Sequence, residues 1–114
     1  MKKIEAFVRT DKTSLVVDAI KKTGTRGLTV FSGKGQGRGE RPMVESSRGT
    51  TRHVAEYNEI DLVVTVVDES EADEIISAIS NAARTGSKGD GKIFVSEVDD
   101  VIDIGSKQKD TFTL

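Results

Sequence analysis

The residues best suited to chemistry form a glycine-rich segment, residues 86–92, with the spacing Gly-x4-Gly-Lys of a phosphate-binding loop. Ile93 stands where such a loop carries the Ser or Thr that holds Mg²⁺. A nucleotide-hydrolysing P-loop also runs from a strand into a helix, so that helix amides meet the phosphates. Here a helical apolar pattern precedes the segment and a strand pattern follows it. The sequence therefore predicts an anion-binding glycine turn and not the P-loop of a nucleotide hydrolase.

Composition narrows the possible classes of protein. A chain of 114 residues suits one compact domain, and 17 basic against 19 acidic side chains provide no overall field for a nucleic-acid backbone. The absence of cysteine excludes disulfides, thiolate zinc sites and cysteine nucleophiles, and the single His53 leaves little for a histidine metal site. No apolar run approaches the roughly 18 residues of a membrane span, and the first residues do not resemble a signal peptide. We therefore expect a cytoplasmic protein that neither enters a membrane nor binds nucleic acid.

Hydrophobic periodicity predicts the elements that position the glycine turn. Residues 2–9 alternate like a half-buried strand, with Ile4, Ala6 and Val8 on one face. Residues 60–67 are almost continuously apolar, which is typical of a central strand buried on both faces. Shorter strands are expected at 27–32 and 92–98, with a possible further strand at 101–104.

Two amphipathic helices are expected between these strands. The first starts after Thr10 or Asp11 and stops at Gly24, and the second runs from a capping box formed by Asp68 and Glu71 to Arg84. The expected core-facing stripes are Leu15, Val16, Ala19 and Ile20 in the first helix, and Ala72, Ile75, Ile76, Ile79, Ala82 and Ala83 in the second.

The order of elements predicts an α+β fold, a ferredoxin-like βαββαβ sandwich with both helices on one face of an antiparallel sheet. A long loop between strands two and three, from residue 33 to about 56, is too long to be a plain connection and is expected to be functional. Leu62, Val64 and Val66 form a second apolar face of strand three that also needs cover. We expect a homo-oligomer that packs sheet on sheet; burial under the long loop is the alternative.

Motifs along most of the chain resemble those of the PII signal-transduction family. They are residues 1–6, 26–30, 35–38, 47–49 and, most specifically, 83–95, and the resemblance fails mainly inside the loop and after Val98. It implies one PII-like domain over residues 1–114, assembled as a homotrimer with adenine-nucleotide sites between subunits. It also implies a flexible T-loop at about 36–56, which docks onto a membrane transporter or metabolic enzyme, and a polar tail at about 105–114.

The resemblance also assigns candidate roles to individual residues. The residues that contact phosphate in the family correspond to Gly89, Asp90, Gly91 and Lys92 of this chain. Such a role suits a glycine turn, because its backbone amides and the lysine ammonium can face an anion. The remaining nucleotide candidates are Thr29, near the adenine, Val66, and Gly35, Gly37 and Arg38 on the phosphate side; Arg48 and Arg52 are candidates for partner docking. The plainer alternatives are an Asp-Gly turn with a solvated lysine, a strand threonine, a flexible glycine linker and solvated loop charges.

Several positions depart from the family pattern. Gly39-Glu40 replaces a glutamine and residues 58–62 contain no lysine, so the usual 2-oxoglutarate ligands are missing and neither 2-oxoglutarate nor Mg²⁺ is expected to bind in the usual way. Asp103-Ile104-Gly105 replaces an Arg-x-Arg that grips phosphates, which favours ADP or AMP over ATP. Tyr57 is the only tyrosine and lies at the edge of strand three, so uridylylation is not expected.

Three classes of function remain after this comparison. The first is a non-enzymatic regulator of nitrogen or carbon metabolism that binds an adenine nucleotide and controls a partner through its long loop. The second is a phosphoryl-transfer enzyme, which the missing Mg²⁺-holding hydroxyl opposes. The third is a CutA-like structural or metal-tolerance trimer, which the lack of cysteine and near lack of histidine opposes. We predict the regulator.

Overall fold

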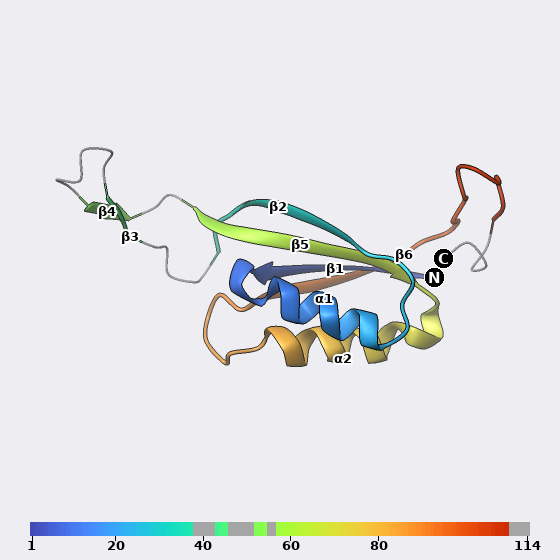
Figure 1. Ribbon diagram of the computed structural model, residues 1–114, viewed down its shortest axis with the longest axis horizontal. Coiled ribbons are helices and arrows are strands. Elements are labelled where there is room, and N and C mark those ends of the chain that lie inside the picture. Colours follow the sequence, from blue (N-terminus) through green and yellow to red (C-terminus); the bar gives the residue numbers. More distant parts are fainter. Residues whose placement is uncertain (38–42, 46–51, 55–56, 110–114) are drawn as a thin grey trace.

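The main sheet has four antiparallel strands in the order β2-β5-β1-β6, and two helices cover one of its faces (Figure 1). The computed structural model describes residues 1–37, 43–45, 52–54 and 57–109, with the backbone alone for 43–45 and 52–54. The strands are β1 (Lys2–Arg9), β2 (Thr29–Gly35), β5 (Asn58–Val67) and β6 (Gly91–Glu97), and the helices are α1 (Thr13–Lys22) and α2 (Ala72–Ala83). This is the predicted α+β arrangement of the ferredoxin-like fold.

The core lies between the sheet and the helices. Alternate residues of β1, namely Ile4, Ala6 and Val8, are fully buried there, as the period-two pattern predicted. The other core side chains are Val63 and Val67 from β5, Val16 and Ile20 from α1, and Ala72, Ile75, Ile79 and Ala83 from α2. The stripe of α2 is thus confirmed, with Ile76 and Ala82 packed against its border.

Helix α1 differs from the prediction at its start. A 3₁₀ turn, Thr10–Lys12, precedes it, so the α-helix begins at Thr13. Leu15, which was expected to face the core, is 51% exposed, because the stripe is centred on Val16 and Ile20 and Leu15 lies about 100° around the helix from Val16. Gly24 ends the helix as predicted, with φ 87° and its amide 3.1 Å from the Lys21 carbonyl oxygen.

The cap of the second helical segment is simpler than the predicted capping box. The Asp68 carboxylate accepts hydrogen bonds from the Glu69 amide at 2.9 Å and from the Ser70 hydroxyl at 3.0 Å. Both bonds lie in the 3₁₀ turn Glu69–Glu71, and Asp68 makes no side-chain bond to Glu71 among the described residues. The 3₁₀ start moves Glu71 away from the position that a capping box requires.

The segment between strands two and three contains more structure than expected. Strand β2 continues to Gly35, because its ladder with β5 extends to the pair Gly35 and Asn58. Two further strands, β3 (Met43–Glu45) and β4 (Arg52–Val54), form a separate antiparallel pair beyond the ends of β2 and β5 (Figure 1). Three-residue strands carry too little periodicity to be recognised in a sequence.

The prediction of a strand at 101–104 is wrong. Ile102 makes only an isolated bridge with Lys109, and residues 103–106 form a turn. The Asp103 carboxylate closes this turn by accepting hydrogen bonds from the amide and the hydroxyl of Ser106, both at 2.8 Å. The local Asp bond therefore overrides the strand propensity of Val101, Ile102 and Ile104.

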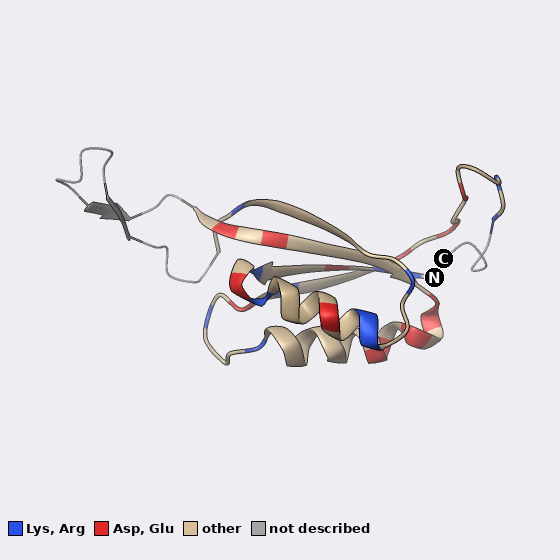
Figure 2. Ribbon diagram, in the orientation of Figure 1, with Lys and Arg blue, Asp and Glu red and all other residues tan. Residues whose placement is uncertain are grey.

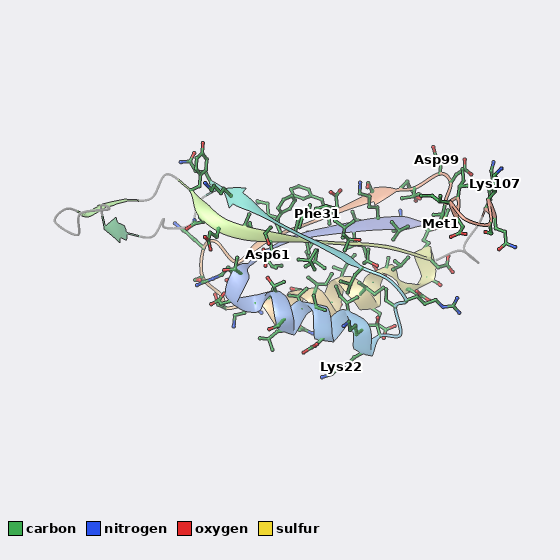
Figure 3. All side chains as sticks on the ribbon, turned by 45° about the horizontal axis from the view of Figure 1, so that its top comes forward. Met1, Lys22, Phe31, Asp61, Asp99 and Lys107 are labelled. Atoms are coloured by element: carbon green, nitrogen blue, oxygen red, sulfur yellow. The ribbon has the colours of Figure 1, made fainter. Side chains whose placement is uncertain are left out.

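The sheet face opposite the helices, here called the open face, carries apolar side chains as well as charged ones, and no described element covers it. Phe31 and Phe94 on this face are 57% and 53% exposed, and the Phe7 and Phe94 rings meet edge to face at 5.8 Å. Leu62, Val64 and Val66, which were predicted to need cover, are only partly buried. Figure 3 shows Phe31 on this side and Asp61 on the side of the helices. In the described part of the chain no helix is long and apolar enough to cross a membrane.

Candidate functional site

The glycine turn joins the end of α2 to the start of β6, and Asp90 organises it. The Asp90 carboxylate accepts hydrogen bonds from the amides of Thr85 at 2.8 Å and Gly86 at 2.9 Å, and from the Thr85 hydroxyl. The Thr85 and Ser87 hydroxyls share a further bond of 2.7 Å. Within the described residues no hydrogen bond engages the amides of Lys88 and Gly89. The turn is therefore folded upon itself while two successive amides at its tip stay available to an anion.

The backbone of the turn requires glycine at particular positions. Gly86, Gly89 and Gly91 have φ values of 90°, 90° and 115°, which other residues rarely adopt. Gly91 also passes so close to β1 that an added Cβ would lie 1.8 Å from the Phe7 carbonyl oxygen. The close approach of the turn to β1 thus depends on the missing side chain of Gly91.

The turn is surrounded mainly by positive charge. Arg84 lies just before the turn, Lys88 lies within it and Lys92 lies where it enters β6, and Figure 2 shows Lys and Arg on both limbs of the turn. The hydrogen bonds from Thr85, and less strongly that from Gly86 and the charge of Arg9, hold the pKa of Asp90 below its ordinary value. Asp90 is therefore ionised, and its charge is directed into the turn and not toward a ligand.

A shallow hollow of about 320 Å³ lies beside the turn, at the start of β6 and the end of α2. Its lining combines apolar and charged side chains, which suits a ligand with both an apolar part and an anionic part. Residues of both kinds line it: Phe7, Ile79, Ala83, Arg84, Asp90 and Lys92.

The predicted nucleotide residues fall into two groups that one chain does not bring together. Gly89, Asp90, Gly91 and Lys92 lie at the β6 edge, whereas Thr29 and Gly35 lie on β2 at the opposite edge. Two strands separate these edges, a distance of about 14 Å across the sheet. The strand register nevertheless places Thr29, Gly35, Val66 and Lys92 on the same open face.

The remaining candidates are less well placed. Gly37 follows β2 and is exposed. Arg38 and Arg48 lie outside the described residues, and for Arg52 only the backbone within β4 is described. Their assigned roles therefore stay predictions.

Two contributors to the turn were missed in the sequence. Thr85 supplies two donors to Asp90, a bond pattern that an Asp placed five residues after a Thr in a glycine-rich turn could have indicated. Phe7 lines the hollow, and its carbonyl oxygen leaves no room for a side chain at Gly91. This contact depends on the pairing of β1 with β6, so no local sequence pattern indicates it.

Comparison with known proteins agrees with this fold. The model of the family described as Nitrogen regulatory protein P-II matches residues 1–108. The chain belongs to the P-II family. It is similar to the Nitrogen regulatory protein P-II of Synechocystis, with 40% identity over 111 residues and 97% coverage of both chains. The P-II protein of Rhizobium meliloti is 43% identical over 104 residues, covering 91% of each chain, and P-II 1 of Methanothermobacter thermautotrophicus is 41% identical over 104 residues, covering 91% of this chain and 89% of its own.

Membership confirms the predicted class of function. P-II proteins are signal-transduction regulators of nitrogen metabolism, and the matched relatives are named as regulatory proteins and not as enzymes. The phosphoryl-transfer and CutA-like alternatives therefore lose their support. The one acidic side chain of the glycine turn, that of Asp90, accepts hydrogen bonds from the backbone and so holds the turn in shape.

Asp90→Asn is expected to weaken the turn in a pH-dependent way. Because the pKa of Asp90 is lowered in the folded protein, its contribution to stability is fully present above the ordinary value of 3.8 and is lost as pH falls through the folded value. Thermal unfolding should therefore show a lower Tm for Asp90→Asn at pH 7 and a smaller difference near pH 3. Asp18→Asn, on the exposed side of α1, is the control and should give no such convergence. A difference in Tm that stays constant with pH would contradict the role of the Asp90 charge.

Proposed function

We propose that this P-II protein is a cytoplasmic homotrimer that binds an adenine nucleotide, ADP, ATP or AMP, in the clefts between subunits. Nucleotide occupancy then controls a membrane transporter or a metabolic enzyme through residues 36–56. The observation that carries the proposal is the glycine turn, with two unengaged amides at its tip and cationic side chains around it.

The chemistry of the turn favours phosphate over other anions. The amides of Lys88 and Gly89 are adjacent, and Lys92 adds a charge where the turn meets β6. Adjacent amides of a glycine turn form a concave donor set that suits tetrahedral oxyanions, and a nearby ammonium strengthens their binding. The apolar hollow beside the turn is a suitable place for the rest of a nucleotide.

Assembly of subunits would complete the site. In one chain Thr29 and Lys92 lie at opposite edges of the sheet, although both are on the open face. The open face carries Phe31 and Phe94, and large exposed apolar patches commonly mark interfaces. Packing of open faces would cover these rings and could place Thr29 of one subunit near the turn of another.

The C-terminal segment favours a ligand with few phosphates. Asp103 stands where family members offer an arginine, and its carboxylate is bound within its own turn by Ser106. These hydrogen bonds keep the pKa of Asp103 below its ordinary value, so the group is anionic. The segment folds back on itself, since Ile102 and Lys109 form an isolated bridge, and it carries the carboxylates of Asp99 and Asp100 in addition to the lysines Lys107 and Lys109. ADP and AMP are therefore preferred over ATP.

Control of the partner would follow from differential affinity. Residues 36–56 begin directly after β2 and include the docking candidates Arg48 and Arg52 as well as the nucleotide candidate Arg38. A nucleotide can shift these residues between arrangements only if it binds one arrangement more tightly than another. Gly35, a nucleotide candidate at the end of β2, is only three residues from Arg38 in the sequence. A nucleotide bound at Gly35 would therefore lie close to the start of residues 36–56.

A panel of ligands tests the proposal. ATP, ADP, AMP and cyclic AMP, each with and without Mg²⁺ and 2-oxoglutarate, are compared by calorimetry and thermal shift. A ligand at 100 times its Kd should stabilise the protein by about 2.7 kcal/mol, with ADP or AMP giving the lowest Kd. Light scattering on the same samples should give three times the chain mass of 12.3 kDa. Absence of any shift would overturn nucleotide control, and nucleotide turnover would favour the enzyme alternative.

A further inference from the structure

Strand β2 is held in place without any buried side chain. Six of its seven residues are exposed and Gly35 is only partly buried, so packing contributes little to its position. As an edge strand it pairs with β5 alone. Two hydrogen bonds that involve β5 side chains supplement that ladder. Thr65 of β5 donates to the carbonyl oxygen of Gly27, just before β2, at 2.7 Å, and Ser32 of β2 donates to the Asp61 carboxylate of β5 at 2.8 Å.

Asp61 links three elements of the fold. It lies in β5 on the face toward the helices, since it pairs with the buried Val8 of β1. One carboxylate oxygen accepts the Ser32 hydroxyl of β2, and the other accepts the hydroxyl of Thr13 at 2.6 Å. Thr13 is the first residue of α1, so Asp61 joins β2 through β5 to the helix layer (Figure 3). Hydrogen bonds to an ionised acceptor are stronger than bonds between neutral groups.

The position of this bond along β2 gives it functional importance. Ser32 is the last residue of β2 whose side chain is bonded to the body of the protein among the described contacts, and Gly33 and Gly35 follow it. Glycines confer backbone freedom on the segment that leads into residues 36–56. Thr65 acts at the other end of β2, near Thr29. Asp61 therefore stands at the boundary between the fixed part of β2 and the exit of the chain toward residues 36–56.

We propose that Asp61 is a positioning residue that holds the exit end of β2 in register, so that residues 36–56 leave the body from a fixed stem. The stem is defined as residues 32–35 of β2 and 58–61 of β5. The link between the stem and signalling rests on the proposed function, but the effect of Asp61 on the stem does not. Loss of the Asp61 bonds loosens the stem and leaves the glycine turn, at the opposite edge of the sheet, unchanged.

Hydrogen exchange of the nucleotide-free protein tests the stem directly. Asp61→Ala should raise the exchange of amides in residues 32–35 and 58–61 about tenfold, as the loss of charge-assisted bonds predicts. Ser32→Ala, which removes one exposed hydroxyl, should reproduce most of this rise without disturbing the Thr13 bond. Asp61→Asn keeps one acceptor oxygen and should show partial rescue. Asp18→Ala, an exposed carboxylate on α1, is the control and should leave the stem unchanged.

Specificity for the stem separates positioning from a general loss of stability. In the Ser32→Ala variant the exchange of core amides in β1 and α2 should stay as in the unchanged protein. Combining Ser32→Ala with Asp61→Ala should add little beyond Asp61→Ala, because both remove the same bond. The proposal would be overturned by a uniform rise in amide exchange over the whole sheet, by additive effects of the two substitutions on exchange, or by unchanged exchange in the stem.

A nucleotide titration then connects the stem to signalling. Ser32→Ala should bind ADP within about twofold of the unchanged protein, since the turn is intact, but ADP should protect the stem amides less. Thr65→Val, which releases the other end of β2 near Thr29, should weaken ADP binding instead. Equal loss of ADP affinity in Ser32→Ala and Thr65→Val would contradict the proposal that the two ends of β2 have different roles. If the unchanged protein binds no nucleotide, the proposed function fails while the exchange experiment still decides the role of Asp61.

Discussion

Gly91→Ala should destabilise the protein by about 3 kcal/mol or more and abolish binding at the glycine turn. The new Cβ would lie 1.8 Å from the Phe7 carbonyl oxygen, and Gly91 has a φ of 115° that alanine rarely adopts. Phe7 cannot move aside easily, because β1 is a central strand whose ladders to β5 and β6 fix its backbone. The start of β6 must then detach, which carries Lys92 away from the turn. Urea unfolding and calorimetry with ADP measure the two effects.

Two other glycines separate the causes of this loss. Gly86→Ala introduces strain at φ 90° but meets open space, so it should cost about 1–2 kcal/mol. Gly27→Ala has open space and no positive φ, so its cost should stay within about 0.5 kcal/mol. Equal stabilities of Gly91→Ala and Gly86→Ala would contradict the steric argument, because only Gly91 of this pair approaches the backbone of β1.

Lys92→Ala should weaken binding of ADP or AMP by roughly tenfold to a hundredfold. A hydrogen bond to a charged group contributes about 1.5–3 kcal/mol, and each 1.4 kcal/mol corresponds to a factor of about ten in Kd. Lys92 is exposed on the open face beside Phe7, so the unfolding free energy should change by less than about 0.5 kcal/mol. Calorimetric Kd values at a fixed salt concentration provide the measurement.

A matched lysine controls for loss of charge alone. Lys22→Ala removes an exposed lysine at the end of α1, far from the glycine turn (Figure 3), and should leave the nucleotide Kd unchanged. If Lys92→Ala binds ADP as tightly as Lys22→Ala does, the assignment of phosphate contact to the turn is wrong. A weaker Kd in both variants would indicate a general electrostatic effect.

Local patterns account for the parts of the fold that were predicted correctly. Burial of Ile4, Ala6 and Val8 follows from their alternation, and burial of Ile75 and Ile79 follows from their spacing in a helix. The errors lie where local signals compete. At Leu15 the helical register placed an apolar residue outside the stripe, and at Ile102 a bond from the neighbouring Asp103 replaced a strand by a turn.

The candidate site was predictable in composition but not in arrangement. The glycines and Lys92 were visible as a motif, and the position of the turn between a helix and a strand was visible from periodicity. The role of Asp90 as the organiser of the turn was not, because a carboxylate in such a motif can face the ligand or the backbone. The hydrogen bonds from Thr85 and Gly86 resolve that choice.

The sequence by itself determined most of the elements, the family resemblance and the candidate ligand-binding residues, because these depend on neighbours along the chain. Only the tertiary structure decided that Gly91 must pass under the Phe7 carbonyl, that Thr29 and Lys92 occupy opposite edges of one face, and that Asp61 bonds to Ser32. The physical reason is the same in each case. Strand order and register bring together residues that are remote in the chain, and their contacts have no local signature.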